Sequence, residues 1–117
     1  MKDGHYFDED NDEVYVQDGE YHRLDGPAVI YNDGCQFWYK NGELDRIDGP
    51  AVIYPDGSQF WYLNGFYHRE DGPAVKRPNG YRQYWYKNEY YSNIKNNVQW
   101  RIEVHRMKRK QKEDLQI

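Results

Sequence analysis

The sequence predicts a mainly β fold, a single-layer antiparallel β-meander of about 3.5 hairpin repeats that ends in a C-terminal helix. The residues Asp-Gly-Pro-Ala recur at 25–28, 48–51 and 71–74, so one unit repeats at a constant interval along the chain. In each unit a short apolar run leads to an Asp-Gly or Asn-Gly pair, the dipeptides that tight β-hairpin turns favour. Aromatic residues make up 18% of the 117 residues while aliphatic residues are sparse, which favours a thin sheet over a globular core.

The first 13 residues are expected to form an acidic extension ahead of the repeats. Five of the six positions from residue 8 to residue 13 are Asp or Glu, and residues 1–20 carry eight acids and one lysine, a net charge of −7. Such a run is commonly a solvated segment, and the sharper alternative is that it mimics nucleic acid and occupies a basic groove on a partner. We therefore take its acids as candidate partner contacts: Asp8, Glu9, Asp10, Asp12 and Glu13.

Residues 14–91 contain the repeats, and two spacings define their register. Trp-Tyr pairs begin at Trp38 and Trp61, one full period apart, and the next pair begins at Trp85, one position later than the period requires. This delay predicts one inserted residue near Tyr81. One period before Trp38 lies Tyr15, so a half repeat precedes three full repeats. One strand for the half repeat and two for each full repeat give seven strands.

Side chains alternate between the two faces of a strand, so aligned positions predict two rows of large side chains. One row contains Tyr15, Trp38, Trp61 and Trp85, and the row on the opposite face contains Val14, Phe37, Phe60 and Tyr84. Aromatic anchors bury a large area at small entropic cost, so rings that the sheet leaves uncovered suit a protein interface. We take four of the rings as candidate partner contacts: Trp38, Trp61, Tyr81 and Trp85.

The combined pattern resembles the MORN-type repeats. The likeness is to the variant whose units read YxNGxxHRxDGPAxxYxDGxxxWYxNG, and it covers residues 14–91 with the glycine turns, the Trp-Tyr pair and the DGPA element in phase. This variant occurs in small proteins of bacteriophages, bacteria and large DNA viruses. The resemblance implies a single antiparallel sheet of successive hairpins that serves as a binding scaffold and not as a catalytic fold.

The HRxDGPA segments are the strongest candidates for chemistry, because they join an imidazole, a guanidinium and a carboxylate. As a candidate ligand site the residues are His22, Arg23, His68 and Arg69. As a structural joint, each Arg would pair with the Asp of its own or a neighbouring copy. The structural interpretation is favoured, because the second copy has Asp45 where the others have histidine. Since these groups repeat and a catalytic site is usually unique, we predict no catalytic residue, no metal site and no cofactor.

Residues 92–117 carry seven bases and three acids and predict a basic helix and tail. Trp100, Val104 and Met107 fall at i, i+4 and i+7, the spacing of one helix face. An eighth strand is the alternative, because apolar residues also alternate from Val98 to Val104, but the lack of Gly and Pro favours the helix. Such a helix would protect the open edge of the sheet. Its exposed bases supply further candidate partner contacts: Arg106, Lys108 and Arg109.

Composition narrows the function classes. Cys35 is the only cysteine, which excludes an internal disulfide and a cysteine-rich zinc site and favours a reducing, cytoplasmic location. The chain shows neither a secretory signal nor an apolar run long enough to span a bilayer, so we expect no membrane span. Phosphate loops, HExxH and nucleophile elbows are absent, and the net charge of −4 opposes nucleic-acid binding except through the basic tail.

These observations favour a non-catalytic protein-interaction module. The resemblance adds the expectation of a phage or viral accessory protein that binds and inhibits a host protein, such as a CRISPR-type or other defence complex. The alternatives are a small-ligand or nucleotide binder using the His-Arg-Asp turns, a nucleic-acid or membrane-surface binder using the basic tail, and a purely structural subunit. The oligomeric state, the identity of the partner and the exposed sheet face stay open at this point.

Overall fold

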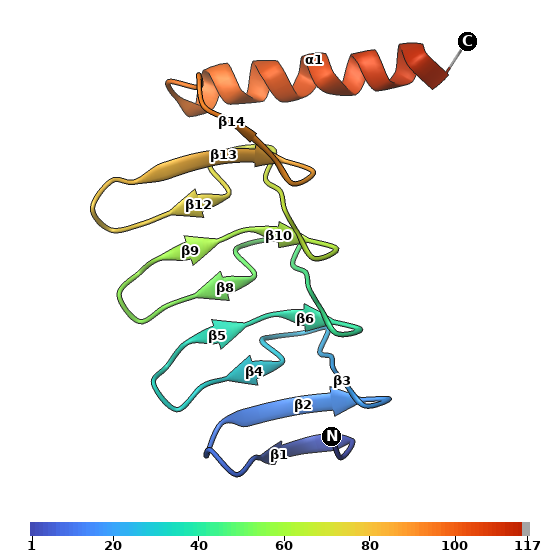
Figure 1. The fold of residues 1–117 in the computed structure, drawn as a ribbon, viewed down its shortest axis with the longest axis vertical. Helices are drawn as coiled ribbons and strands as arrows, with labels where there is room; N and C mark the ends of the chain where they lie inside the picture. The colour runs from blue at the N-terminus through green and yellow to red at the C-terminus, as the bar shows by residue number, and fades with distance from the viewer. Residues whose placement is uncertain (116–117) are drawn as a thin grey trace.

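The structure is one open antiparallel sheet with a helix across one end, as the sequence predicted. A computed structural model describes residues 1–115 of the chain. The repeats stack in chain order from the N-terminus to α1 (Asn97–Leu115), so sequence position becomes position along the molecule (Figure 1). The molecule measures 49 × 40 × 19 Å, and its shortest dimension holds a single sheet layer with side chains on both faces.

Residues 1–115 contain fourteen strand segments, most of them two residues long; ten belong to the main sheet, and β6-β7 and β10-β11 form two separate two-stranded pairs. Nine follow one another in the order β1-β2-β4-β5-β8-β9-β12-β13-β14, and each neighbouring pair is antiparallel. The strands are β1 Gly4–Phe7, β2 Glu13–Gln17, β3 Glu20–Tyr21, β4 Val29–Ile30, β5 Gln36–Phe37, β6 Tyr39–Lys40, β7 Glu43–Leu44, β8 Val52–Ile53, β9 Gln59–Phe60, β10 Tyr62–Leu63, β11 Phe66–Tyr67, β12 Val75–Lys76, β13 Arg82–Tyr86 and β14 Glu89–Tyr91.

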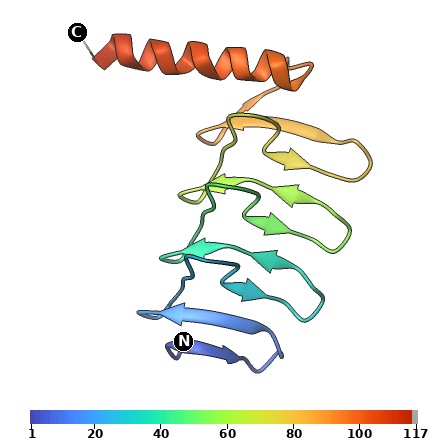
Figure 2. The ribbon, with the colours of Figure 1, turned by 180° about the vertical axis from the view of Figure 1, so that it is seen from behind.

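Each full repeat contains one hairpin, β4 and β5 in the first repeat, and one short strand, β7 in the first repeat, that leads toward the next. In the first repeat β4 pairs with β5 through a turn in which Gly34 has a φ of 96° and the Asp33 carboxylate accepts a hydrogen bond from the Cys35 amide (2.9 Å). β5 pairs in turn with β8 of the next repeat, which joins the hairpins into one sheet. β6 turns through Asn41 and Gly42 into β7, and the two kinds of turn lie at opposite margins of the sheet (Figure 2). The seven predicted strands are present, and β7 and its equivalents are added to them.

The sheet begins at Gly4, not at residue 14 as predicted. β1 lies inside the expected acidic extension and pairs with β2 along its whole length. His5 on β1 stacks on Tyr15, with ring centroids 4.0 Å apart. The Asp3 carboxylate accepts hydrogen bonds from two amides of the turn that follows β2. The segment carries none of the repeat motifs, so the sequence did not identify it as a strand.

The last repeat keeps the period of the earlier ones, so the predicted insertion near Tyr81 is wrong. Val75 pairs with Gln83, just as Val52 in the preceding repeat pairs with Phe60. Both partners advance by the same interval along the chain, which leaves no place for an extra residue. The hairpin turn before this strand therefore has the same length in every repeat.

The Trp-Tyr pair of the last repeat is instead shifted by one position along its strand. Tyr84 occupies the place that Trp61 has in the preceding repeat, and Trp85 lies on the opposite face from Trp61. The Arg69 amide agrees with this register, because it donates to the Trp85 carbonyl (3.1 Å) in the way that the Arg46 amide donates one repeat earlier. The two predicted rows are therefore wrong at their last members, because Tyr84 and Trp85 each lie on the face predicted for the other.

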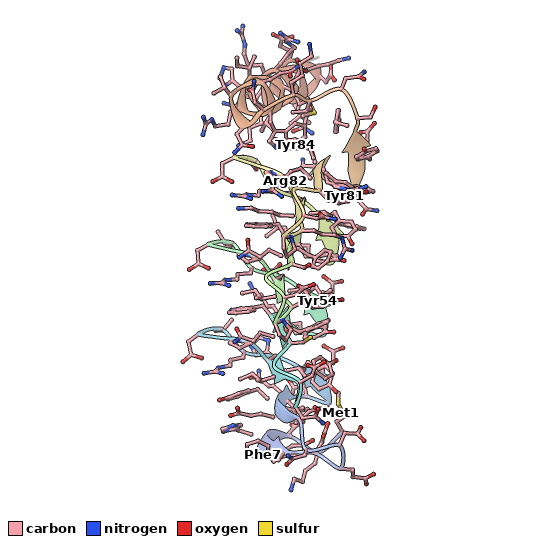
Figure 3. The ribbon with its side chains drawn as sticks, turned by 90° about the vertical axis from the view of Figure 1, so that its left-hand side faces the viewer. Met1, Phe7, Tyr54, Tyr81, Arg82 and Tyr84 are labelled. Atoms are coloured by element: carbon pink, nitrogen blue, oxygen red, sulfur yellow. The ribbon has the colours of Figure 1, made fainter. Side chains whose placement is uncertain are left out.

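The two faces of the sheet differ in character, as the edge-on view in Figure 3 shows. The three HRxDGPA segments project from one side, which we call the joint face. Tyr54 and Tyr81 lie on the other side, which we call the tyrosine face (Figure 3). Rings in contact on the tyrosine face are Tyr21 with Tyr39, Tyr31 with Phe37, Tyr54 with Phe60, Tyr62 with Tyr67, and Trp85 with both Tyr67 and Tyr90.

The helix α1 closes the C-terminal end of the sheet, and the predicted stripe of Trp100, Val104 and Met107 faces the strands. Trp100 has no exposed surface, and its Nε1 donates to the Arg69 carbonyl (2.8 Å). Its ring packs on Tyr84 with centroids 5.3 Å apart, so Trp100 continues the aromatic stack beyond the last strand. The helix is confirmed, and the alternative of an eighth strand is wrong.

Buried apolar side chains form three small clusters and not one core. The first contains Tyr84, Tyr86, Trp100 and Val104, the second Val14, Val16 and Val29, and the third Val52, Phe60 and Val75. Each cluster spans only neighbouring strands, which is the arrangement of a repeat array stabilised layer by layer. The contacts between one layer and the next therefore decide whether the array holds together.

Candidate protein-binding surface

Each HRxDGPA joint is held together by its arginine. In the first joint the Arg23 guanidinium stacks on the Tyr15 ring, with Cζ 4.0 Å from the ring centroid. Its Nε donates to Asp25 Oδ1 (3.0 Å) and its Nη1 donates to the Pro27 carbonyl (3.1 Å). The hydrogen bond from Arg23 lowers the pKa of the Asp25 carboxyl. The same contacts recur in the other two joints, with Arg46 stacked on Trp38 and Arg69 stacked on Trp61.

The glycine of each DGPA element is explained by close approach and not by an unusual φ. A Cβ atom at Gly26 would lie 2.7 Å from Cζ of Arg23, which is closer than real side chains come. At Gly49 and Gly72 the equivalent distances to the arginine are 2.8 and 2.7 Å. Glycine is therefore the residue that lets the guanidinium lie between the aromatic ring and the loop backbone.

The histidine of the motif ties one repeat to the next. Nδ1 of His22 accepts a hydrogen bond from the Asn41 amide (3.0 Å), and Nδ1 of His68 accepts one from the Lys87 amide (2.9 Å). In the second copy Asp45 Oδ2 accepts the same kind of hydrogen bond (2.9 Å). A histidine and an aspartate are interchangeable here, because each supplies one acceptor to a turn amide.

This interchange predicts the outcome of two substitutions. We expect His22→Asp to leave the free energy of unfolding within about 0.5 kcal/mol of the wild type, because the turn amide keeps an acceptor. We expect His22→Leu to lower it by about 1 kcal/mol, because the acceptor is lost. Urea unfolding followed by tyrosine and tryptophan fluorescence measures both. Equal losses in the two variants would contradict the assigned role.

Successive joints leave two slots between them on the joint face. The first slot, of about 510 Å³, lies between the first and second joints and is lined by Trp38. The second, of about 820 Å³, lies between the second and third joints and is lined by Trp61. Each slot has a joint loop on either side, so the period of the repeat also sets the spacing of the slots.

The residue between Arg and Asp in each joint forms an exposed tip beside a slot. Leu24 is 77% exposed and Ile47 is 88% exposed, and both line the first slot. Single exposed apolar residues are common, but two at one repeating position, beside two slots, form a patch of the kind that binds a partner. These two residues were not predicted as contacts from the sequence, although an apolar residue at the variable position of a polar turn was the available signal.

The joints place their carboxylates outward and their guanidiniums inward. The Arg23 side chain is 23% exposed and the Asp25 side chain is 87% exposed, and the second joint has nearly the same values. The arginine and aspartate of a joint cancel in net charge, but a partner that approaches the tips meets the carboxylate first. The accessible surface along the tips is therefore apolar and acidic.

The third joint is different, because Glu70 replaces the apolar tip residue. The Glu70 carboxylate pairs with Lys108 of α1 and with Nε2 of His68 (3.1 Å). Partial burial would raise the pKa of the Glu70 carboxyl, but the hydrogen bonds of Lys108 and His68 outweigh it and lower the pKa. The helix is thus tied to this joint, and the apolar tips are confined to the first two.

The aromatic residues selected from the sequence lie on both faces. Trp38 and Trp61 line the slots of the joint face. Trp85 lies on the tyrosine face, where its ring packs on Tyr67 with centroids 5.0 Å apart, and Tyr81 is exposed on the same face. Of the four candidate histidines and arginines, His68 and the arginines line slots, whereas His22 lines neither. The structure therefore brings Trp38 and Trp61 together with the joints and separates Tyr81 and Trp85 from them.

The acidic residues selected from the sequence have unequal roles. Asp8 Oδ1 accepts hydrogen bonds from the amides of Asp10 and Asp12 (3.0 Å each), and Asp12 is itself buried and accepts from an amide of the first repeat. Glu13 pairs with a histidine of β1 (2.6 Å). Carboxylate oxygens of Asp8, Asp10 and Asp12 lie within 4.8 Å of one another, a proximity that the folding of this loop around Asp8 explains. Glu9 and Asp10 are the acids of the loop whose side chains face solvent.

The basic residues selected from the sequence lie on α1. Arg106 is exposed and pairs with Glu103 of the same helix (2.7 Å), and Arg109 is exposed further along it. Lys108 contacts Glu70, so it also serves the attachment of the helix. Within residues 1–115, no helix combines the length and the apolar character that a bilayer span requires.

No protein-family model, curated protein or solved structure matches this chain. The candidate site therefore rests on its own geometry. It consists of two neighbouring slots, the tips Leu24 and Ile47, and the outward carboxylates of the joints. Within residues 1–115 the helix is attached to the third joint through Lys108 and Glu70, whereas the first slot is lined by residues of the first two joints.

Proposed function

We propose that this chain is a non-catalytic protein-interaction module and that the joint face is its binding surface. The observation that carries the proposal is the pair of apolar tips, Leu24 and Ile47, each more than three-quarters exposed beside a slot. Repeat folds commonly bind partners along the surface on which their loops line up. Tips of this kind would lose their contact with water when a partner covers the slots, which favours association.

The charges at the tips indicate what the partner offers. Asp25 and Asp48 point their carboxylates outward, so a complementary segment carries lysine or arginine beside its apolar residues. A nucleic acid would bring phosphates against these carboxylates and is disfavoured at this surface. We therefore infer a protein segment that is both apolar and basic.

A catalytic or small-ligand role has less support. His22 uses Nδ1 to accept a turn amide, and His68 uses Nδ1 in the same way and Nε2 against Glu70. The three joint arginines are engaged in stacking and in hydrogen bonds within their own loops. These groups are explained by the architecture, which leaves the His-Arg-Asp turns as structural joints.

The proposal has a finer form, which concerns the origin of this chain and the kind of protein that it binds. The resemblance to MORN-type repeats of phage and viral proteins supports a viral accessory protein that occupies a host protein, for instance a component of a defence complex such as a CRISPR-type effector. The non-catalytic surface is consistent with inhibition by steric occlusion. A partner that used a basic, apolar segment for its own assembly or substrate binding would be blocked by such contact.

We expect the double substitution Leu24→Asp/Ile47→Asp to weaken partner binding without unfolding the chain. Affinity capture from host cells with mass spectrometry identifies a partner, and titration calorimetry with the purified partner measures affinity. We expect a loss of at least about tenfold, since two apolar contacts are each replaced by a carboxylate. The control is Tyr81→Asp, which places the same carboxylate at a residue that is 47% exposed on the opposite, tyrosine face. Unchanged affinity in the double variant, or equal loss in the control, would refute the assignment.

A further inference from the structure

The molecule carries opposite charges at its two ends. Residues 1–20 have a net charge of −7 and residues 92–117 a net charge of +4, while the repeats between them are nearly neutral. Because the repeats stack in chain order, this difference along the sequence is also a difference along the molecule (Figure 1). One end of the array is therefore acidic and the other is basic.

The N-terminal end is an open sheet edge with apolar and acidic side chains. β1 is the last strand in the sheet order and pairs on one side with β2, and on its other side no strand pairs with it within residues 1–115. Phe7 is 64% exposed and Met1 is similarly exposed, and both lie at this end (Figure 3). The adjoining loop presents the exposed acids Glu9 and Asp10. An uncovered strand edge of this kind favours association unless something covers or guards it.

The C-terminal end is the outward side of α1. The helical repeat places Val98, Ile102 and Arg109 on the side of the helix opposite the buried Trp100. Ile102 is 53% exposed and Val98 is similarly exposed, although both are apolar. The helix therefore has a second surface, apolar near its start and basic around Arg109, ahead of Glu113 and Asp114, which points away from its own sheet.

We propose that the acidic N-terminal end of one copy docks on the outward side of α1 of a second copy, in a head-to-tail contact. The helix would then cover two sheet edges, its own C-terminal edge through Trp100 and the β1 edge of its neighbour through Val98 and Ile102. The exposed acids Glu9 and Asp10 would meet the basic end of the helix around Arg109. Contacts between like ends are disfavoured, because they place acid against acid or base against base.

The geometry of this contact has consequences for assembly. It joins two different surfaces of the same chain, so each added copy leaves one free end of each kind, and chains lengthen with concentration. The ion pairs lie at the protein surface, so salt screens them and weakens the association. This contact uses the ends of the array and is independent of the proposed partner at the joint face.

Sedimentation velocity of the purified 117-residue chain tests the proposal. We expect the weight-average sedimentation coefficient to rise with protein concentration at low salt and to fall toward the monomer value when salt is added. A species that sediments as a monomer at every concentration and salt level would overturn the proposal. Association that salt strengthens would also contradict it, because the contact would then be apolar alone.

Reciprocal charge reversal gives the sharper test. Glu9→Lys/Asp10→Lys replaces the exposed acids of the first end by bases, and Arg109→Glu/Lys112→Glu replaces Arg109 and the exposed Lys112 of the helix by acids. Each double variant alone is expected to associate at least about tenfold more weakly than the wild type, because like charges meet. An equimolar mixture of the two is expected to recover association by alternating, since every contact in it pairs opposite charges. Weakening without recovery in the mixture would contradict the head-to-tail arrangement.

Two further measurements separate the contact from a change in folding. Lys40→Glu/Glu43→Lys reverses charges of exposed residues at a turn in the middle of the array and is expected to leave association unchanged. With Cys35 replaced by serine, Asp10→Cys and Arg109→Cys chains are expected to form a mixed disulfide on oxidation faster than either chain pairs with itself. Preferential self-pairing of either variant would overturn the assignment even if the charge-reversed chains failed to fold.

Discussion

Trp100→Ala is expected to lower the free energy of unfolding by about 3–5 kcal/mol, the usual cost of removing a large, fully buried aromatic side chain. The ring has no exposed surface, and it packs against both Tyr84 and Tyr91 with centroid distances of 5.3 Å. Its Nε1 also donates to the Arg69 carbonyl, which would be left without that donor. The packing of α1 on the end of the sheet depends on this residue, because the buried side chains of α1 are Trp100 and Val104.

The loss should have a local signature as well as a global one. In an array whose layers contact only their neighbours, loss of the helix contacts destabilises the last repeat before it affects the first. We therefore expect the far-ultraviolet helix signal to decrease and hydrogen exchange to accelerate at β13 and β14 while β2 and β4 stay protected. Ile102→Ala, on the outward side of the same helix, is the control and should change stability by less than about 0.5 kcal/mol. A Trp100→Ala protein as stable as this control would show that the helix does not close the sheet.

Much of the fold could be predicted because the same motif occurs three times along the chain. Each DGPA element is followed by a hairpin turn at a fixed distance, so a single period predicted the strands, the turns and their order. The stripe of Trp100 and Val104 predicted the helix for a similar reason, since its spacing fits one face. β1 was missed because it carries no copy of the motif. Its pairing with β2 is a contact between segments that no local sequence pattern indicates.

The register of the last repeat shows how an alignment of motifs can mislead. The Trp-Tyr pair at Trp85 looks like a copy displaced by one insertion, but strand pairing follows the backbone turns, which keep the period of the earlier repeats. A one-residue shift moves a side chain to the other face, so Trp85 joins the tyrosine face and Tyr84 joins the joint face. Tyr84 then supplies the ring on which Trp100 packs, which suits the end of the array.

The candidate site was predictable only in part. The joints were identified from the sequence, and the substitution of Asp45 for histidine already favoured a structural role. The slots and the tips were not, because exposure depends on how far one joint stands from the next, and the sequence does not state that distance. Leu24 and Ile47 occupy the variable position of the motif, which a search for recurring residues passes over.

The second large effect is expected from Trp38→Ala, which should lower the free energy of unfolding by about 2–4 kcal/mol. The value lies below that of a fully buried tryptophan because Trp38 is only half-buried. The Arg46 guanidinium stacks on the ring with Cζ 4.0 Å from the ring centroid, and the guanidinium donates its hydrogen bonds within its own joint. Part of the loss therefore belongs to the pair and not to either residue alone.

A double-mutant cycle of Trp38→Ala and Arg46→Ala isolates that part. We expect a coupling of about 1 kcal/mol, the size of a partly desolvated cation–π contact. The matched control couples Trp38→Ala with Arg69→Ala, whose guanidinium stacks on Trp61 one repeat away, and should give less than about 0.5 kcal/mol. If the two cycles gave the same coupling, the arginines would stabilise the array through their positive charge and not through stacking on one particular ring. Coupling confined to the stacked pair would instead mean that HRxDGPA recurs because each layer needs its own arginine on its own ring.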